Sequence, residues 1–475
     1  MQQRYLKPIH VWALSLGCAV GWGAFVMPAT TLLPIAGPVG TVLALVVGTL
    51  IMAVIAVNLH TMIMRTDEKG GVFAYTKKMF GYDHSFLCVW LLVLAYVSIL
   101  WANATAFVLI SRFLFNGALQ FGFHYTVTGY DVYAGEILLT LFVIFFFGMV
   151  TMNSKRAVNN ANAVMALIMV FGTLACTVLV AYRHGIVFSQ LVPHFADLLA
   201  SKKDAVSSAS VVSAALYEKP HWLQVFNSIV LAPWAYVGFE AVSLTTGEST
   251  FDKKKSLAIL LLSLVCGCSI YIAMTILSLL VLPDGCSSWQ DYIMNLASYS
   301  GRDGLPVFHA AEAALGSGGL VLLGMCVISA LSTSMIGLYR SASRILLVMA
   351  EDDVLPEWFS KTTHRGLPKN ALLFIMLLSC VIPFLGRTAI GWIVDVTTIS
   401  ASIVYLYISA CALKTGTLEK SAPICVQGAV GVLISCVLFF FPLIPSLWNI
   451  GMLATESYLI FAGWSIIGFV IFRFL

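Results

Sequence analysis

Long apolar segments separated by short polar stretches make up most of this chain. Apolar runs of roughly 18 to 30 residues, the length that lets a helix cross the hydrocarbon core of a bilayer, recur about twelve times. We expect membrane spans at residues 9–36, 39–64, 85–115, 135–152, 160–182, 223–248, 256–282, 318–350, 370–387, 389–413, 424–442 and 455–474. The pattern therefore predicts an all-α, polytopic membrane protein with one domain and about 12 transmembrane helices.

Two of these apolar segments contain a break. The first break is Gly21-Trp22-Gly23, within residues 11–35, and the second covers residues 233–240, within residues 225–246. Lipid offers no hydrogen bonds to a backbone, so a helix that breaks at membrane depth must line a cavity enclosed by protein or filled with water. A pair of interrupted segments in corresponding halves of a chain indicates the binding site of a transporter.

The break positions also divide the chain into two similar blocks. Spans one to five occupy residues 9–182, spans six to ten occupy residues 223–413, and each block opens with an interrupted helix. This arrangement is typical of an inverted repeat. Residues 424–474 then add two further helices.

Composition and charge agree with this interpretation. The 475 residues are 60% hydrophobic and 10% charged, which excludes a soluble globular domain of this size. Most of the 26 Lys and Arg residues fall in loops on the side of the predicted membrane that also holds the N-terminus. Because cytoplasmic loops carry the excess of Lys and Arg, we expect both termini in the cytoplasm and a multi-pass protein in the cell membrane.

The chemistry-bearing residues favour binding over catalysis. Nearly all of the 11 Cys lie in apolar runs, where a free Cys behaves as a small hydrophobe, so we expect no structural disulfide. The nine His form no metal-ligand spacing, and no nucleophile–base set, phosphate-binding loop or nucleic-acid patch is evident. We therefore expect no enzyme, cofactor, metal or nucleic-acid partner. A non-transporting membrane sensor or channel is the remaining alternative to a transporter.

Several stretches in chain order carry a family resemblance. They are residues 17–25 (GCAVGWGAF), 69–75 (KGGVFAY) with 80–81 (FG), 234–240 (WAYVGFE) with Glu248, and 341–346 (SASRIL) with 352–356 (DDVLP) and 366–368 (GLP). Together they resemble the amino acid–polyamine–organocation (APC) permeases. The resemblance implies a leucine-transporter-type fold, a five-plus-five inverted repeat with two trailing helices. It also implies secondary transport of an amino acid or related amine by alternating access, as a monomer or a homodimer.

The first break suits the carboxylate of a zwitterion. It frees backbone N–H groups at the start of a half-helix, where the helix dipole also favours an anion. Gly21, Trp22 and Gly23 are therefore candidate binding residues, since glycine allows close backbone approach. The alternative is that both glycines serve close helix packing.

The second break supplies backbone carbonyls that can accept from an ammonium group. We expect Ala235, Tyr236 and Gly238 near this contact. Trp234 resembles the gate aromatic of arginine/agmatine-type antiporters in the family. Its indole could close over the substrate and offer a π face to a cation, or it could simply pack in the bundle.

The third span offers a candidate pocket wall. Tyr96 and Asn103 are seven residues apart and so share a helix face, with Trp101 nearby. Such a face usually points inward, although hydrogen bonding between helices explains it equally well.

Two carboxylates lie within predicted spans. An intramembrane carboxylate is a functional candidate by default, so Glu240 could carry a proton or could cap the broken helix. Asp395 could face the pathway or sit at an outer helix end near Arg387. Glu248 is expected to end its helix and pair with the lysines at 253–255.

The coupling ion stays open at this point. Ser332 and Thr333 could contribute to a sodium site, as hydroxyls of this span do in some leucine-transporter-type proteins, or they could pack helices. Proton-coupled members of the APC family carry a lysine on the fifth helix, but residues 158–182 contain none. We favour exchange or proton coupling, with a sodium-coupled symporter as the alternative. A neutral or aromatic amino acid fits the pocket chemistry best.

Overall fold

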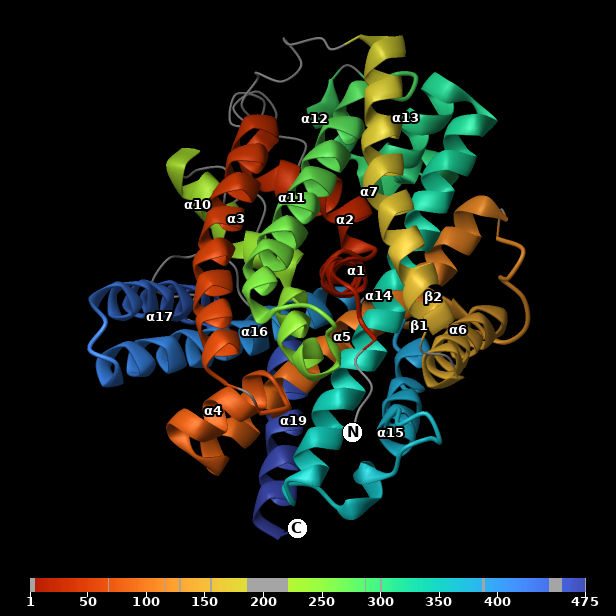
Figure 1. Cartoon of the computed structure of the whole chain (residues 1–475). Helices are drawn as coiled ribbons and strands as arrows, with labels where there is room; N and C mark the ends of the chain where they lie inside the picture. Colours follow the sequence, from red (N-terminus) through yellow and green to blue (C-terminus); the bar gives the residue numbers. More distant parts are fainter. Residues whose placement is uncertain are drawn as a thin grey trace.

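Nearly every segment that the hydropathy pattern predicts as a span is helical in the computed structural model (Figure 1). The structure describes residues 5–66, 68–115, 117–127, 130–153, 156–185, 221–286, 288–299, 301–386, 389–443 and 455–474.

The elements of the first block follow the expected spans closely. They are α1 (Pro8–Ala19), α2 (Gly23–Met27), the π-helical turn η1 (Pro28–Leu32), α3 (Leu33–Arg65), α4 (Val72–Phe80), α5 (Tyr82–Leu114), β1 (His124–Val127), β2 (Tyr130–Tyr133), α6 (Ala134–Asn153) and α7 (Arg156–His184). α3 contains the turn between the first two spans, because Gly37 has φ 66° and ψ −178° inside it.

The second block begins with another broken helix. Its elements are α10 (His221–Leu231), the 3₁₀ segments η3 (Ala232–Tyr236), η4 (Phe239–Glu248) and η5 (Lys253–Lys255), then α11 (Ser256–Leu280), α12 (Trp289–Met294), η6 (Leu296–Ser298), η7 (Gly301–Gly304), α13 (Pro306–Leu315) and α14 (Ser317–Glu351). They continue with η8 (Glu357–Ser360), α15 (Lys369–Ser379), η9 (Ile382–Phe384), α16 (Ala389–Leu418), α17 (Ala422–Leu443) and α19 (Thr455–Phe474).

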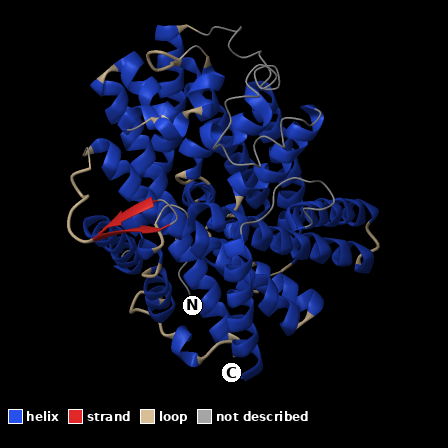
Figure 2. Cartoon of the chain, turned by 180° about the vertical axis from the view of Figure 1, so that it is seen from behind, coloured by secondary structure: helices blue, strands red, loops and turns tan. Residues whose placement is uncertain are grey.

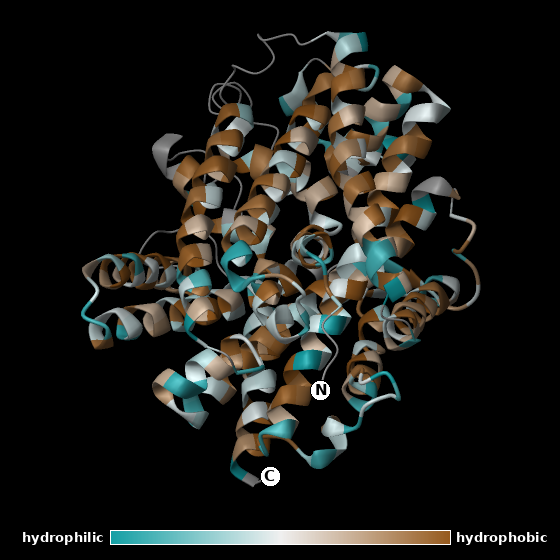
Figure 3. Ribbon diagram, in the orientation of Figure 1, coloured by the Kyte–Doolittle hydropathy of each residue, from teal (hydrophilic) through white to brown (hydrophobic). Residues whose placement is uncertain are grey.

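The helices have the length and composition of membrane spans. Among the described residues, ten helices are long and apolar enough to cross a membrane, and two shorter apolar helices cover Pro8–Ala19 and Lys369–Phe384. Figure 3 shows hydrophobic residues along the bodies of the helices, with hydrophilic residues mostly near their ends and in the connections. The prediction of an all-α, polytopic membrane protein is confirmed.

A small β-hairpin was not predicted. β1 and β2 pair antiparallel between α5 and α6 and lie at one edge of the molecule (Figure 2). Arg112 at the end of α5 forms an ion pair with Glu136 at the start of α6, and its guanidinium lies 4.4 Å from the centre of the Tyr130 ring. The hairpin therefore covers the charged junction between these two helices.

α1 lies at the centre of the bundle, where Figure 1 shows it almost end-on, and it packs against α7, α11, α14 and η4. A Cβ atom at Gly17 would lie 2.8 Å from the Cβ atom of Thr333, and one at Gly337 would lie 2.7 Å from Cys18 Sγ. Small residues let helices approach closely in a membrane. The first half-helix is therefore held tightly against α14.

The last helix, α19, is fastened to α5 by a pair of tryptophans. The rings of Trp90 and Trp464 stack with centroids 4.4 Å apart. Each indole Nε1 donates to the backbone carbonyl of the other residue at 3.0 Å. Gly468 leaves room for this stack, since a Cβ there would lie 2.4 Å from Trp90 Nε1.

Candidate functional site

The first break leaves two backbone donors without partners. α1 ends at Ala19, the next residue Val20 is extended, and α2 begins at Gly23. The Trp22 N–H donates to Asn103 Oδ1 at 2.9 Å. Within the described part of the chain, the N–H groups of Gly21 and Gly23 have no hydrogen-bond acceptor. The break thus presents two free donors at the start of a half-helix.

Asn103 ties this break to two other helices. Its side chain accepts from Trp22 and donates through Nδ2 to Ser334 Oγ on α14 at 2.8 Å. A Cβ atom at Gly21 would lie 2.4 Å from Asn103 Oδ1. The structure therefore brings Asn103 to the break, where its amide fixes the position of the backbone. The contact between Ser334 and α5 was not predicted, because only the fold brings this hydroxyl to Asn103.

The second break leaves backbone acceptors open. Gly238 has φ 112°, a left-handed conformation that favours glycine, and a Cβ there would lie 2.7 Å from the backbone carbon of Cys18. Among the described residues, no hydrogen bond reaches the carbonyl oxygens of Ala235, Tyr236 and Val237. These carbonyls are free to accept from a ligand.

The two broken helices meet each other. Ser15 Oγ on α1 donates to the carbonyl of Phe239 on η4 at 3.1 Å, and Gly238 packs directly on Cys18. The Trp234 ring lies over Gly23, because a Cβ atom there would be 2.3 Å from Cη2 of the indole. The donors of the first break and the acceptors of the second therefore belong to one region of the bundle.

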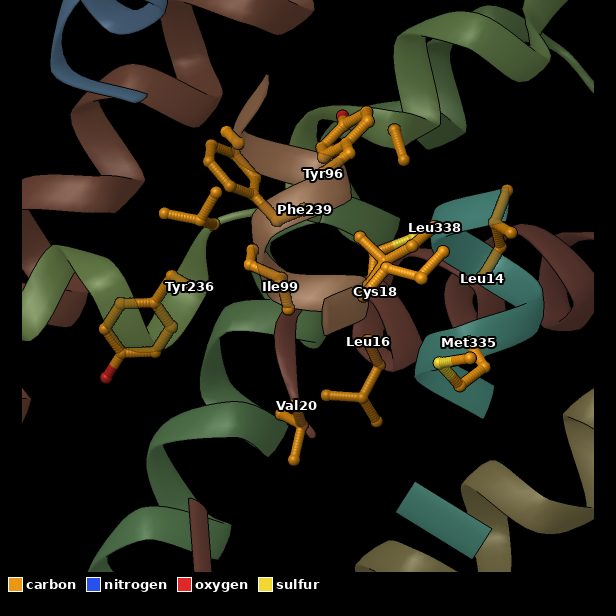
Figure 4. Packing of buried hydrophobic residues seen from close by; sticks show 14 of the residues in the cluster. Leu14, Leu16, Cys18, Val20, Tyr96, Ile99, Tyr236, Phe239, Met335 and Leu338 are labelled. Atoms are coloured by element: carbon orange, nitrogen blue, oxygen red, sulfur yellow. The ribbon is translucent and has the colours of Figure 1, made fainter. Parts of the chain in front are cut away.

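The Tyr236 side chain points away from this region. Its hydroxyl lies 2.7 Å from Thr49 Oγ1 and 3.2 Å from the carbonyl of Leu45, both on α3. Figure 4 shows the Tyr236 ring directed away from Cys18 and Phe239. Only the backbone of Tyr236 is placed to meet a ligand.

Glu240 closes the second break from within. Its carboxylate, in a residue only 1% exposed, accepts the Gly238 N–H at 3.0 Å to one oxygen and 3.2 Å to the other. The fully buried phenols of Tyr96 on α5 and Tyr405 on α16 interact electrostatically with this carboxylate. Neither hydroxyl has a hydrogen bond of ordinary geometry among the described atoms. Tyr96 therefore lies beside the Glu240 carboxylate.

The far ends of the two half-helices are joined by an ion-pair network. The Glu248 carboxylate accepts from Arg340 and Arg344 on α14, each at 2.7 Å, and from the Tyr5 hydroxyl at 2.8 Å. The N–H groups of Tyr5 and Leu6 donate to the Glu248 carbonyl at 2.9 and 3.0 Å. The N-terminal arm is thereby bound to the end of η4.

This network corrects the expected pairing of Glu248 with the lysines at 253–255. Glu248 is buried and faces α14, so the long guanidinium side chains of that helix reach it. Lys253 instead donates to the backbone carbonyl of Thr66 at 2.8 Å. Sequence spacing alone could not reveal a partner that lies about ninety residues further along the chain.

Of the two candidate ion ligands, Thr333 lies at the contact between α1 and α14, and Ser332 is a buried neighbour on α14. The Thr333 hydroxyl donates to the carbonyls of Ser329 and Ala330 in its own helix, each at 2.9 Å. The backbone of Thr333 packs against Gly17. This geometry is that of helix packing.

Two other predicted residues are not brought to the breaks. Asp395 Oδ2 accepts from Ser457 Oγ on α19 at 2.8 Å, and Arg387 lies outside the described residues. Trp101 Nε1 donates to Ser379 Oγ on α15 at 3.0 Å. Asp395 and Trp101 therefore contact neighbouring helices, and the spacing of residues along their own helices could not predict these partners.

Comparison of the sequence with known proteins finds a family of membrane transporters. The family model described as "Amino acid permease" matches residues 6–472. The chain is 22% identical to the arginine/ornithine antiporter ArcD1 of Lactococcus lactis over 95% of its length and 82% of that protein. It is 22% identical to the methylthioribose transporter of Bacillus subtilis over 99% of its length and 92% of that protein. The putrescine transporter PotE of Haemophilus influenzae is 24% identical, over 54% of this chain and 58% of that protein.

A match across nearly the whole chain, on a bundle whose first and sixth spans are both broken, confirms the resemblance drawn from the sequence motifs. The chain belongs to the amino acid permease family of the APC superfamily.

Proposed function

We propose that this protein is a secondary transporter that carries an amino acid or a related amine across the cell membrane by alternating access, with both termini in the cytoplasm. The observation that carries the proposal is the meeting of two broken helices. One offers the free N–H groups of Gly21 and Gly23, and the other offers the free carbonyls of residues 235–237. The named relatives, which include an arginine/ornithine antiporter and a putrescine transporter, support the same substrate class.

Each half of a zwitterion has a counterpart in this region. The substrate carboxylate binds the donors of Gly21 and Gly23, where the start of α2 also contributes a positive dipole end. The substrate ammonium group binds the carbonyls of Ala235 and Tyr236. An unpaired charge buried in the membrane is costly, so a site that satisfies both charges selects molecules that carry both.

Trp234 acts as the gate over the carboxylate site. Its indole lies on Gly23 and is only 8% exposed, so it must move before a ligand can reach the Gly23 N–H. The Trp234 Nε1 group has no hydrogen bond among the described atoms, so no bond from this nitrogen holds the ring in place. An indole that swings over the bound substrate also offers a π face to a cationic side chain.

The network around Glu248 closes the pathway at the side of the N-terminus. Tyr5, Arg340 and Arg344 converge on one buried carboxylate and hold the ends of α1 and η4 against α14. A path to that side opens only when α1 and η4 separate from α14. Because Tyr5 and Leu6 also bind the backbone of η4, α1 and η4 move together in this step.

Transport proceeds by exchange or with a proton. Glu240 is the candidate proton carrier, since its buried carboxylate lies beside Gly238 of the second break and two phenols. Protonation would weaken its hold on the Gly238 N–H and so link charge at Glu240 to the shape of the second break.

Purified protein in proteoliposomes tests this function. We expect labelled amino acid to enter the vesicles when unlabelled amino acid or amine is present inside, with pH and sodium varied in turn to identify the coupling. A thermal-shift screen of amino acids and amines gives a second readout, because a ligand stabilises the protein in proportion to the logarithm of its concentration over its dissociation constant. Absence of both exchange and stabilisation across the whole panel would refute the proposal.

A further inference from the structure

Tyr271 of α11 is a buried tyrosine beside the first break that the sequence patterns did not single out. Its side chain is only 1% exposed. The Tyr271 hydroxyl lies 3.5 Å from the position that a Cβ atom of Gly23 would take, next to the Trp234 ring. In the part of the chain that the structure describes, this hydroxyl has no hydrogen-bond partner.

Two other buried tyrosines of the bundle have partners, whereas the Tyr96 and Tyr405 hydroxyls beside Glu240 have none among the described atoms. The Tyr236 hydroxyl binds Thr49 and the carbonyl of Leu45, and the Tyr339 hydroxyl donates to the carbonyl of Ile144 at 3.0 Å. Burying a hydroxyl without a partner is unfavourable, and buried tyrosine hydroxyls usually find one. The unpaired hydroxyl of Tyr271 lies beside the first break, so a hydrogen-bonding group of a ligand bound there can supply its missing partner.

The neighbouring free group defines the kind of ligand. The N–H of Gly23 is a donor, and the Tyr271 hydroxyl is a second donor that lies beside the same residue. Two donors at one residue suit an acceptor that can take several hydrogen bonds, and a carboxylate has two oxygens with about four acceptor positions.

We propose that the Tyr271 hydroxyl donates to the carboxylate of the bound amino acid and so completes, with the N–H groups of Gly21 and Gly23, a three-donor site. This inference rests on the proposed function and adds a specificity-determining residue on the seventh span. Tyr271 then distinguishes an amino acid from the amine that remains when its carboxylate is removed. The N–H groups alone bind any anion at the break, whereas the phenol adds a directed bond at its edge.

The variant Tyr271→Phe tests the inference, with Tyr339→Phe as the matched control. Two quantities are measured in proteoliposomes: the KM of the amino acid that the wild type carries best, and the inhibition constant of the amine formed by its decarboxylation (putrescine for ornithine, agmatine for arginine). A hydrogen bond to a charged group corresponds to a change of about tenfold or more in affinity.

For Tyr271→Phe we expect the KM of the amino acid to rise about tenfold and the inhibition constant of the amine to stay within about twofold. The melting temperature of the ligand-free protein should stay unchanged, because no internal bond is lost. Tyr339→Phe should instead lower the melting temperature and leave the ratio of the two constants as in the wild type.

The results separate this inference from the function on which it rests. If Tyr271→Phe leaves the KM unchanged, or raises both constants equally, the carboxylate contact is wrong while amino acid transport stands. If the wild type carries and binds no amino acid or amine, the proposed function fails and the role of Tyr271 falls with it.

Discussion

The contact between Gly23 and Trp234 gives the sharpest test of the gate. In Gly23→Ala, the new Cβ atom would lie 2.3 Å from Cη2 and 2.5 Å from Cζ3 of the indole, whereas ordinary contacts begin at 3.4 Å. The ring must therefore move outward by about 1.1 Å. Overpacking of this kind typically costs about 1–3 kcal/mol, which corresponds to a loss of roughly five- to 150-fold in the population of the closed gate.

The assay is homologous exchange of the transported amino acid in proteoliposomes, with kcat and KM determined separately. We expect Gly23→Ala to lower kcat/KM about tenfold or more, because the indole can no longer return to its closed position on Gly23 in each transport cycle. Gly324→Ala is the matched control, since a Cβ atom at this buried helical position meets nothing within 4 Å. It should transport normally and be as stable as the wild type or slightly more so, because alanine favours a helix over glycine.

A second variant decides between a gate and a general disturbance of the fold. Trp234→Phe removes the part of the ring that collides with the new methyl group, so Gly23→Ala should do less harm in the Trp234→Phe background than alone. Strictly additive effects of the two substitutions, or wild-type exchange by Gly23→Ala, would refute the reasoning.

The remaining predictions concern the other contacts of the breaks. Cys18 Sγ lies 3.7 Å from Ser341 Oγ, so an oxidant should form a disulfide in the variant Ser341→Cys and stop exchange until the disulfide is reduced. Continued exchange by the cross-linked protein would show that α1 need not separate from α14. Glu240→Gln should flatten the pH dependence of exchange, and an unchanged pH profile would leave this residue a structural role. Asn103→Ala should lower exchange, and it should lower the free energy of unfolding by about 1–3 kcal/mol, because the buried Trp22 N–H loses its acceptor. A melting temperature equal to that of the wild type would contradict this.

The spans and breaks could be predicted because local sequence determines them. Lipid requires long apolar helices, and glycine at residues 21, 23 and 238 gives the backbone the freedom to leave the helix, so both features show in the hydropathy pattern and the composition. Gly238 illustrates this directly, since its left-handed conformation and its contact with Cys18 both exclude a side chain.

Side-chain partners were harder to predict, because they depend on which helix lies opposite. Glu248 was assigned to neighbouring lysines in the sequence, yet its partners come from α14 and from the N-terminal arm. The sequence around Asp395 does not indicate that its side chain faces α19. Tyr271 was passed over because one tyrosine in an apolar helix gives no pattern, and only the position of Gly23 beside it made the residue informative.

The tryptophan pair between α5 and α19 has a practical consequence. Stacked indoles at 4.4 Å couple their electronic transitions, so Trp90 and Trp464 should produce an exciton couplet in the circular dichroism spectrum of the intact protein. Loss of this couplet during heating would report that the C-terminal helix has undocked, even while the remaining helices keep their secondary structure. An optical signal of this kind needs no label and can be followed in detergent or in lipid.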